Sequence, residues 1–237
     1  MINRGLPNES LWIESFVKSK RFDEVVQAVR EMPSNTIVTF FDKDSGNRIS
    51  GERKSTPRFD SLRGGDIDLQ PLYILDYITS KSDGVIYDIG CGYNFFKKFY
   101  NVIGIDPDSD QADIHRSYDL SMAAENMGKM DNVFSINAIH FCHPDELGQR
   151  VQAFFDMVKP GGYAYLAVNV ARVFQDLLDF DRLPEDQRNK NVKVLSKYAK
   201  ANVLDICRDE VIYWKDTIAN KFDSYMNGNV KILIRKT

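Results

Sequence analysis

Hydrophobic positions along this chain of 237 residues follow two different periods. Short continuous apolar runs, rich in strand-forming residues, occur at 85–87, 102–105, 133–137 and 163–169. Apolar residues at helical spacing precede the first run, at 69–78, and the last, at 151–158. Strands that alternate with helices predict βαβ units and a mostly parallel sheet. Two later apolar runs, 211–214 and 230–234, flank a polar segment and predict the last two strands.

The first 65 residues follow a different pattern. Residues 9–31 have mostly helical spacing with a break near Lys20, and 36–41 and 48–50 read as two short strands around a polar turn. This order predicts a helical segment, a small hairpin and a polar loop. We therefore expect an N-terminal α+β cap at 1–65, which is not an independent domain, and a main α/β domain at 66–237.

A glycine turn follows the first strand of the main domain, in the sequence DIGCGYN at 88–94. Gly90 and Gly92 remove side chains where a ligand must approach the backbone. The second strand then delivers Asp106 to the carboxyl end of the sheet, where open α/β folds bind ligands. A carboxylate there can accept hydrogen bonds from both hydroxyls of a ribose, so the segment predicts a nucleoside-binding crevice. Because Asp106 is followed by Pro107, a helix N-cap is the alternative role.

The dinucleotide-binding fingerprint GxGxxG is the alternative interpretation of the same turn. In that pattern the third glycine permits close packing of a helix, and the helix N-terminus holds a pyrophosphate. Here the third glycine position is Phe95, whose bulk opposes such packing. The turn therefore fits a nucleoside ligand without phosphate better than it fits a nicotinamide dinucleotide.

Five pieces of sequence in this order resemble the class I S-adenosylmethionine-dependent methyltransferases. They are Asp88 to Asn94, Asp106, Tyr118 to Leu120, Val133 to Asn137, and Lys159 to Gly162. The third glycine of the methyltransferase pattern is Asn94, and asparagine is among the few residues that adopt positive φ without large strain. The resemblance covers roughly residues 66–237. It implies a Rossmann-like seven-stranded sheet with helices on both faces, and S-adenosyl-L-methionine (SAM) as the cofactor.

The resemblance also implies which residues bind this cofactor. They are Asp88, Gly90, Cys91, Gly92, Asn94, Asp106, Asp119, Leu120 and Asn137. Asp88 is expected to organise the turn through hydrogen bonds, and Asp106 to bind the ribose. Asp119 would accept a hydrogen bond from the adenine amino group with Leu120 beside the ring, unless it is a solvated turn aspartate.

Two details depart from the family pattern. The helix expected at 95–100 is short by about one turn, and only a brief connection links Asp106 to the third strand expected at 112–114. These trimmed crossovers leave open how much of the adenosine is enclosed. They also leave the alternative of a noncatalytic SAM-binding or scaffolding module.

Methyl transfer from a sulfonium needs mainly proximity, alignment and exclusion of water. A general base is optional, and His140, just past the fourth strand, can take a proton from a hydroxyl or an amine. The alternative is a histidine satisfied in the wall of the fold. His143 and Cys142 are too few ligands for a metal site, so no metal is expected.

The class of methyl acceptor is restricted only by the absence of known base-methylation motifs. Amino-directed DNA methyltransferases carry Pro-Pro and an aromatic residue after the fourth strand, whereas Asn137 is followed here by Ala138 and Ile139. The net charge of -3 also argues against a protein that coats nucleic acid, so a small-molecule acceptor is favoured. The basic residues of the Lys43–Arg63 region leave nucleic acid as an alternative partner. They are interleaved with acidic residues, so the region also reads as a solvated loop.

The cysteines indicate the compartment. Cys91, Cys142 and Cys207 are widely spaced, form no CxxC pair and predict neither a disulfide framework nor a zinc site. No apolar run approaches the roughly 20 residues that a membrane helix needs. We expect a cytoplasmic protein without membrane association.

Overall fold

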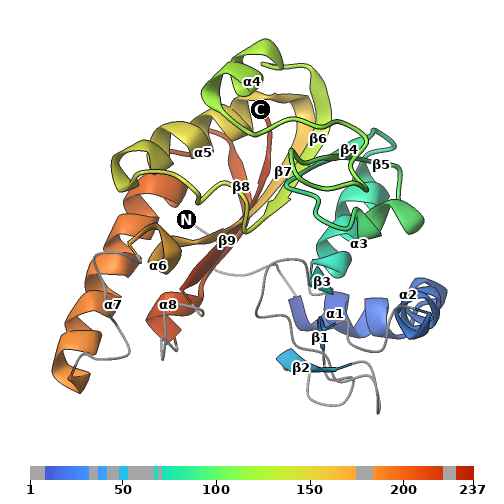
Figure 1. Cartoon of the computed structure of the whole chain (residues 1–237), viewed down its shortest axis with the longest axis horizontal. Coiled ribbons are helices and arrows are strands. Elements are labelled where there is room, and N and C mark those ends of the chain that lie inside the picture. The colour runs from blue at the N-terminus through green and yellow to red at the C-terminus, as the bar shows by residue number, and fades with distance from the viewer. Residues whose placement is uncertain are drawn as a thin grey trace.

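The main part of the chain is built around a single mixed sheet (Figure 1). The computed structural model describes residues 9–31, 37–41, 48–52, 67–68, 71–174, 184–220 and 228–237. The strand order of the sheet is β5-β4-β6-β7-β9-β8. The parallel strands are β4 (Ile86–Ile89), β5 (Val102–Ile105), β6 (Met130–Ile136) and β7 (Val158–Asn169). β9 (Asn229–Arg235) runs antiparallel between β7 and β8 (Glu210–Asp216). The α/β class with a mostly parallel sheet is confirmed.

The sheet of the described residues has six strands, so the expected count of seven is wrong. The third strand expected at 112–114 is reduced to one isolated bridge between Ile105 and Ile114. The Asp113 carboxylate accepts a hydrogen bond from Gly104 N at 2.9 Å, so a side chain takes a place that a backbone ladder would fill. Ile114 is 42% exposed and has no buried face to stabilise a strand.

Helices cover both faces of this sheet, as expected. One face carries α3 (Leu72–Lys81) and the 3-10 helix η1 (Phe95–Lys98), which pack with Phe134 and Tyr165 of the sheet. The other face carries α4 (Leu120–Glu125), α5 (Leu147–Asp156) and α7 (Glu185–Ala199), which pack with Val133 and Leu166. Because successive strand residues point to opposite faces, the runs 133–134 and 165–166 supply both cores.

The remaining helices connect these layers. α6 (Val170–Val173) follows β7 directly, the 3-10 turn Pro144–Glu146 precedes α5, and α8 (Thr217–Asn220) follows β8. α7 begins earlier than the residue expected, 192, because its first turns are polar and exposed and carry no apolar period; it continues into a π-helical turn at Lys200–Leu204. No helix among the described residues is both long and apolar enough to cross a membrane.

The N-terminal part contains the predicted helices and hairpin. α1 (Glu9–Val17) and α2 (Lys20–Arg30) are separated at Ser19, whose side chain caps α2 through Phe22 N. β1 (Ile37–Phe41) and β2 (Arg48–Glu52) pair antiparallel, and β3 (Ile67–Asp68) joins β1 in parallel, which the sequence did not predict. Buried residues of α1 and α2 share the core of α3. The polar loop was expected at 51–65, but Gly51 and Glu52 belong to β2, and 53–65 lies outside the described residues. The domain boundary at residue 65 stays a prediction.

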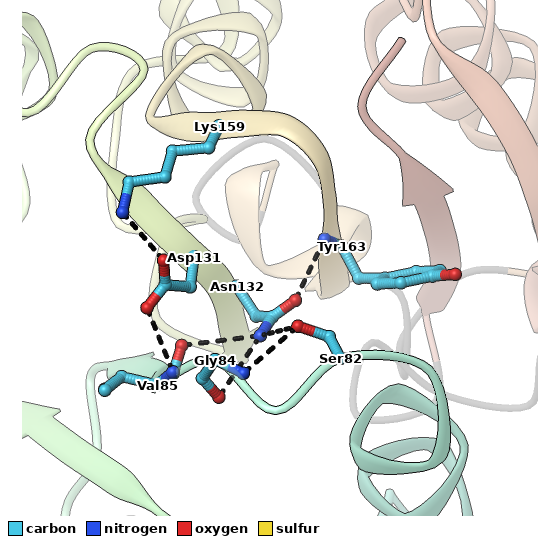
Figure 2. Close-up of polar contacts among 7 residues, drawn as sticks. All are labelled: Ser82, Gly84, Val85, Asp131, Asn132, Lys159 and Tyr163. Atoms are coloured by element: carbon cyan, nitrogen blue, oxygen red, sulfur yellow. Dashed lines mark hydrogen bonds and ion pairs between the residues drawn. The ribbon is translucent and has the colours of Figure 1, made fainter.

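A buried amide joins β6 and β7 to the loop between α3 and β4 at the amino-terminal edge of the sheet (Figure 2). Asn132 is fully buried; its Oδ1 accepts from Tyr163 N at 3.1 Å, and its Nδ2 donates to Ser82 Oγ at 3.1 Å. Its neighbour Asp131 bonds Val85 N at 3.1 Å and Lys159 Nζ at 2.7 Å. The segment 159–162 lies inside β7, not in a turn before it, and the β6–β7 register shifts beside Asn132. This edge holds the strands together, away from the glycine turn.

Candidate functional site

The glycine turn lies where β4 ends, at the point where the strand order reverses. β4 is flanked by β5 on one side and by β6 on the other, and open α/β sheets bind ligands at the carboxyl ends of such strands. The amides of Gly90 and Cys91 donate to Ile105 O at 2.7 and 3.3 Å. The end of β5 thus fixes the turn that follows β4.

The two glycines of the turn have different reasons to be glycine. Gly90 has φ 77° and packs on Ala138, since a Cβ at Gly90 would lie 2.2 Å from the Ala138 Cβ. Gly92 has φ 50°, and apart from its chain neighbours no atom of the described residues lies within 4 Å of the position its Cβ would take. The expected close approach of a ligand therefore fits Gly92, whereas the space beside Gly90 is filled by the protein itself.

Asp106 is tied to the turn from the end of β5. Its Oδ2 accepts from Gly92 N at 3.1 Å, and its Oδ1 accepts from Asp108 N at 2.9 Å and Ser109 N at 3.1 Å. These are N-cap-like bonds, although no helix follows here. A carboxylate has about four acceptor positions, and the three bonds leave about one, on Oδ2, for a ribose hydroxyl. Asp106 is half-buried and thus accessible from one side.

Asp88 is a buried carboxylate without a partner among the described residues. It is 3% exposed, and its oxygens accept no hydrogen bond from any described residue, so the hydrogen bonds expected from Asp88 to the turn are not formed. Burial, with a smaller contribution from the negative charge of Asp106, raises the pKa of Asp88 to about 7. Asp88 is therefore about half ionised at pH 7, and a cationic group beside it would favour the ionised form.

Asn94 and Cys91 complete the turn. Asn94 has φ 48°, the positive φ expected at the third glycine position, and its Nδ2 donates to Gln111 O at 2.9 Å and Asp113 Oδ2 at 3.1 Å. Asn94 thus fastens the turn to the segment that replaces the third strand, and only its Oδ1 is buried without a partner. Burial, with the charges of Asp88 and Asp106, raises the pKa of the Cys91 thiol to about 12 and keeps it protonated.

Asp119 is the N-cap of α4, a role that the sequence reading did not consider. Its Oδ1 accepts from Met122 N at 2.7 Å, and the preceding Tyr118 is anchored by its hydroxyl to Arg150 O. Asp119 is exposed and Leu120 is half-buried. The second carboxylate oxygen of Asp119 stays available, and an aspartate one residue before the first helical position was the missed signal.

The segment after β6 contains Asn137 and His140. Asn137 is exposed with φ 54°, and its amide donates to Ala167 O at 2.9 Å. His140 is 5% exposed, its Nδ1 is buried without a hydrogen-bond partner, and its ring lies 4.4 Å from the Phe141 ring. Burial and then the positive charge of Arg172 lower the pKa of His140 to about 4, so the imidazole is neutral at pH 7.

Arg172 is the charged residue near this site that the sequence reading missed. It lies on α6, the short helix after β7, and its backbone amide is capped by Asn169. Nothing in the pattern of a four-residue helix singles it out, because its proximity to His140 depends on the pairing of β6 with β7. Among the described residues no group of three potential metal ligands occurs, and His143 Nδ1 accepts from Asp145 N.

Comparisons with known proteins give matches among solved structures alone. No protein-family model and no curated protein matches this chain. A SAM-dependent methyltransferase from Methanosarcina mazei is 18% identical, with a TM-score of 0.46, over 71% of this chain and 98% of its own. Geranyl diphosphate methyltransferase in complex with SAM is 14% identical, with a TM-score of 0.42, over 71% of this chain and 84% of its own. A structure from work on thioacetal formation during echinomycin biosynthesis is 20% identical, with a TM-score of 0.31, over 41% of this chain; the chain spans 47% of that protein.

Proposed function

We propose that this protein is a SAM-dependent methyltransferase that acts on a small-molecule acceptor. The observation that carries the proposal is the glycine turn at the strand-order reversal, with Gly92 open to a ligand and bonded to Asp106. Asp106 presents a carboxylate at the end of β5, where a ribose hydroxyl would donate a strong hydrogen bond to the position left on Oδ2. The turn has no adjoining long helix that would favour a phosphate.

The residues present fit the cofactor in charge as well as in position. SAM, when bound, would supply a methyl group on a cationic sulfonium. A nucleophile would attack the methyl carbon in line and displace the sulfur. Asp88, 3% exposed, lies near the end of the strand that leads to the turn and has no cationic partner among the described residues. An ammonium or sulfonium group beside Asp88 would restore the charge balance that burial removes. Asp119 and Leu120 would complete the adenine side of the pocket.

A dinucleotide-dependent oxidoreductase fits the same turn poorly. Phe95 is buried and contacts Phe99 ring to ring at 5.3 Å, so the third glycine position is filled. The element that follows is the 3-10 helix Phe95–Lys98, four residues long. So short an element offers little of the helix dipole that holds a pyrophosphate.

His140 is the candidate base in this proposal. Because its imidazole is neutral at pH 7, one ring nitrogen is free to accept a proton from an acceptor hydroxyl or amine. The pKa of about 4 makes it a weak base, so its contribution is to receive the proton as the new bond forms rather than before. Asn137, exposed at the end of β6, would lie on the cofactor side of the same loop.

The test is methyl transfer from methyl-labelled SAM to a library of small hydroxyl, amine and carboxylate compounds. The proposal expects a labelled product from the wild-type protein, and slower product formation by Asp106→Ala at SAM concentrations that do not saturate the variant. SAM binding without transfer to any compound would favour the second candidate, a noncatalytic SAM-binding module. The reduced third strand and the low pKa of His140 are the observations behind that candidate.

Three further predictions, on domain organisation, compartment and partner, accompany the proposal. The cap at 1–65 would cover a main domain at 66–237, and the compartment would be the cytoplasm. Nucleic acid stays an alternative partner through the Lys43–Arg63 region, where no side chain belongs to the described part of the chain. Salt-dependent binding of an oligonucleotide would support that alternative.

A further inference from the structure

Two neighbouring strands bring His140 and Arg172 to one place. β6 and β7 are paired in parallel up to Ile136 and Ala167, and Asn137 N still donates to Ala167 O at 2.9 Å beyond that pair. His140 comes four residues after Ile136, and Arg172 comes five residues after Ala167. Both residues therefore lie just past the carboxyl ends of adjacent strands, on the edge of the sheet that holds the glycine turn.

Arg172 carries a charge that no described side chain neutralises. It is exposed, and its guanidinium makes no ion pair and no hydrogen bond with any described residue. Its charge reaches His140, since it contributes to the lowered pKa of that imidazole. An exposed arginine beside a ligand site presents a fork of donors that matches carboxylate and phosphate groups.

His140 supplies the second, independent feature. It is 5% exposed, its Nδ1 has no partner, and the imidazole makes no hydrogen bond to any described residue. Buried polar atoms without partners are rare and indicate a missing ligand or water. Phe141, which is 65% exposed, stacks on the imidazole and adds an apolar wall beside it.

We infer that Arg172 and His140 form the acceptor subsite, and that the acceptor is a small anion whose carboxylate or phosphate group pairs with Arg172. This inference rests on the proposed methyltransferase function. The anion would hold the acceptor so that a hydroxyl lies between the imidazole and the SAM methyl group. An O–H bond of the acceptor then breaks, its proton passes to His140, and its oxygen forms the new O–CH₃ bond. The S–CH₃ bond breaks with its electron pair remaining on sulfur, so S-adenosylhomocysteine, the methyl ether and a protonated imidazole result.

The experiment uses the three histidines of the chain as reporters. The imidazole resonances of the full-length protein are followed by NMR at pH 7 and constant ionic strength during separate titrations with acetate and inorganic phosphate. We expect a saturable shift of His140, half-complete at millimolar anion, and no saturable shift of the exposed His115 and His143. A His140 shift with acetate alone, with phosphate alone or with both would show which anionic group the subsite binds.

Variants separate the subsite from general charge effects. Arg172→Met keeps the apolar stem and should abolish the His140 shift, Arg172→Lys should retain it with at least a few-fold weaker affinity, and Arg208→Met should leave it unchanged. Arg208 is also exposed without an ion pair among the described residues, but it precedes β8 at the opposite edge. A His140 resonance that responds to neither anion, or that responds equally in Arg172→Met, would overturn the inference.

The same samples distinguish this inference from the proposed function. Addition of S-adenosylhomocysteine should shift the amide resonances of Gly90 and Gly92. If those amides do not move, the methyltransferase proposal fails while the anion titration still reports on Arg172. If they move and His140 ignores both anions, the cofactor site stands and the anionic acceptor is wrong.

Discussion

Ala138 occupies the space that a side chain at Gly90 would need: a Cβ there would lie 2.2 Å from the Ala138 Cβ. This contact joins the turn after β4 to the segment after β6, which leads to His140 two residues later. The position of the proposed base is thus tied to the glycine turn by packing. Gly90 serves the architecture of the site, and Gly92 leaves room for the ligand.

Gly90→Ala should be more destabilising than Gly92→Ala. Both substitutions place a side chain at positive φ, which costs about 1 to 2 kcal/mol. Gly90→Ala also collides with Ala138, and overpacking adds about 1 to 3 kcal/mol. Urea denaturation of the two variants beside wild type measures the difference. Equal losses would show that Ala138 yields freely and that packing does not fix this junction.

Asp88→Asn should change the pH dependence of folding stability. The pKa of Asp88 is raised from 3.8 to about 7, so between these values the folded protein binds more protons than the unfolded chain. Stability due to this group therefore falls as pH rises from about 4 to 7 and stays low above that. The uncharged variant should exceed wild type in stability at pH 8, by an amount on the order of 4 kcal/mol, and match it near pH 4. Urea midpoints that differ by the same amount at both pH values would contradict the buried, unpartnered carboxylate.

SAM should bind more tightly as pH rises through 7. The sulfonium and ammonium groups favour the ionised form of Asp88, so binding at lower pH must first remove its proton. Calorimetric titrations at pH 6 and pH 8 should show higher affinity at pH 8 in wild type, with a smaller change in Asp88→Asn. Affinity that is flat with pH in both proteins would place the cationic part of the ligand elsewhere.

Asn132→Ala should destabilise the protein without touching the site. The substitution leaves the buried Tyr163 N–H without an acceptor and removes the link to Ser82, a loss of about 1 to 3 kcal/mol. Lys159→Ala, which removes a half-exposed ion pair beside it in Figure 2, should cost at most about 1 kcal/mol. Denaturation curves and the affinity for S-adenosylhomocysteine are measured on both variants. A large loss of affinity in Asn132→Ala would mean that the two edges of the sheet are coupled.

Much of the fold could be predicted from the sequence because local pattern and tertiary environment agree. The runs that form β4, β5, β6 and β9 are apolar because both faces of the sheet are covered. The segment at 112–114 misleads because Ile114 looks like a strand residue, while the Asp113 side chain bonds Gly104 and Asn94 in place of a ladder. Backbone pairing is thus limited to the bridge at Ile114, and a side chain that takes over the rest leaves no periodic signal.

The candidate site likewise contains features that could be predicted from the sequence and features that could not. The glycine turn and Asp106 could be located because each follows directly from a strand that ends beside it. The partners of these residues could not be predicted, because only the three-dimensional arrangement decides them. Among the described residues Asp88 has no partner, and Asp106 accepts from the Gly92 amide. Arg172 was missed for the same reason, because its relation to His140 depends on the neighbouring strands rather than on sequence spacing.

The central claim is that the turn and Asp106 bind the nucleoside part of SAM. Calorimetric titration with S-adenosylhomocysteine tests it directly on wild type, Asp106→Ala, Asp106→Asn and the control Asp131→Ala, whose carboxylate lies at the opposite edge of the sheet (Figure 2). Micromolar binding by wild type and Asp131→Ala, weakened by about 1.5 to 3 kcal/mol or about 10- to 150-fold in Asp106→Ala and by less in Asp106→Asn, is the predicted result. No binding to wild type, or the same affinity in all four proteins, would contradict the claim.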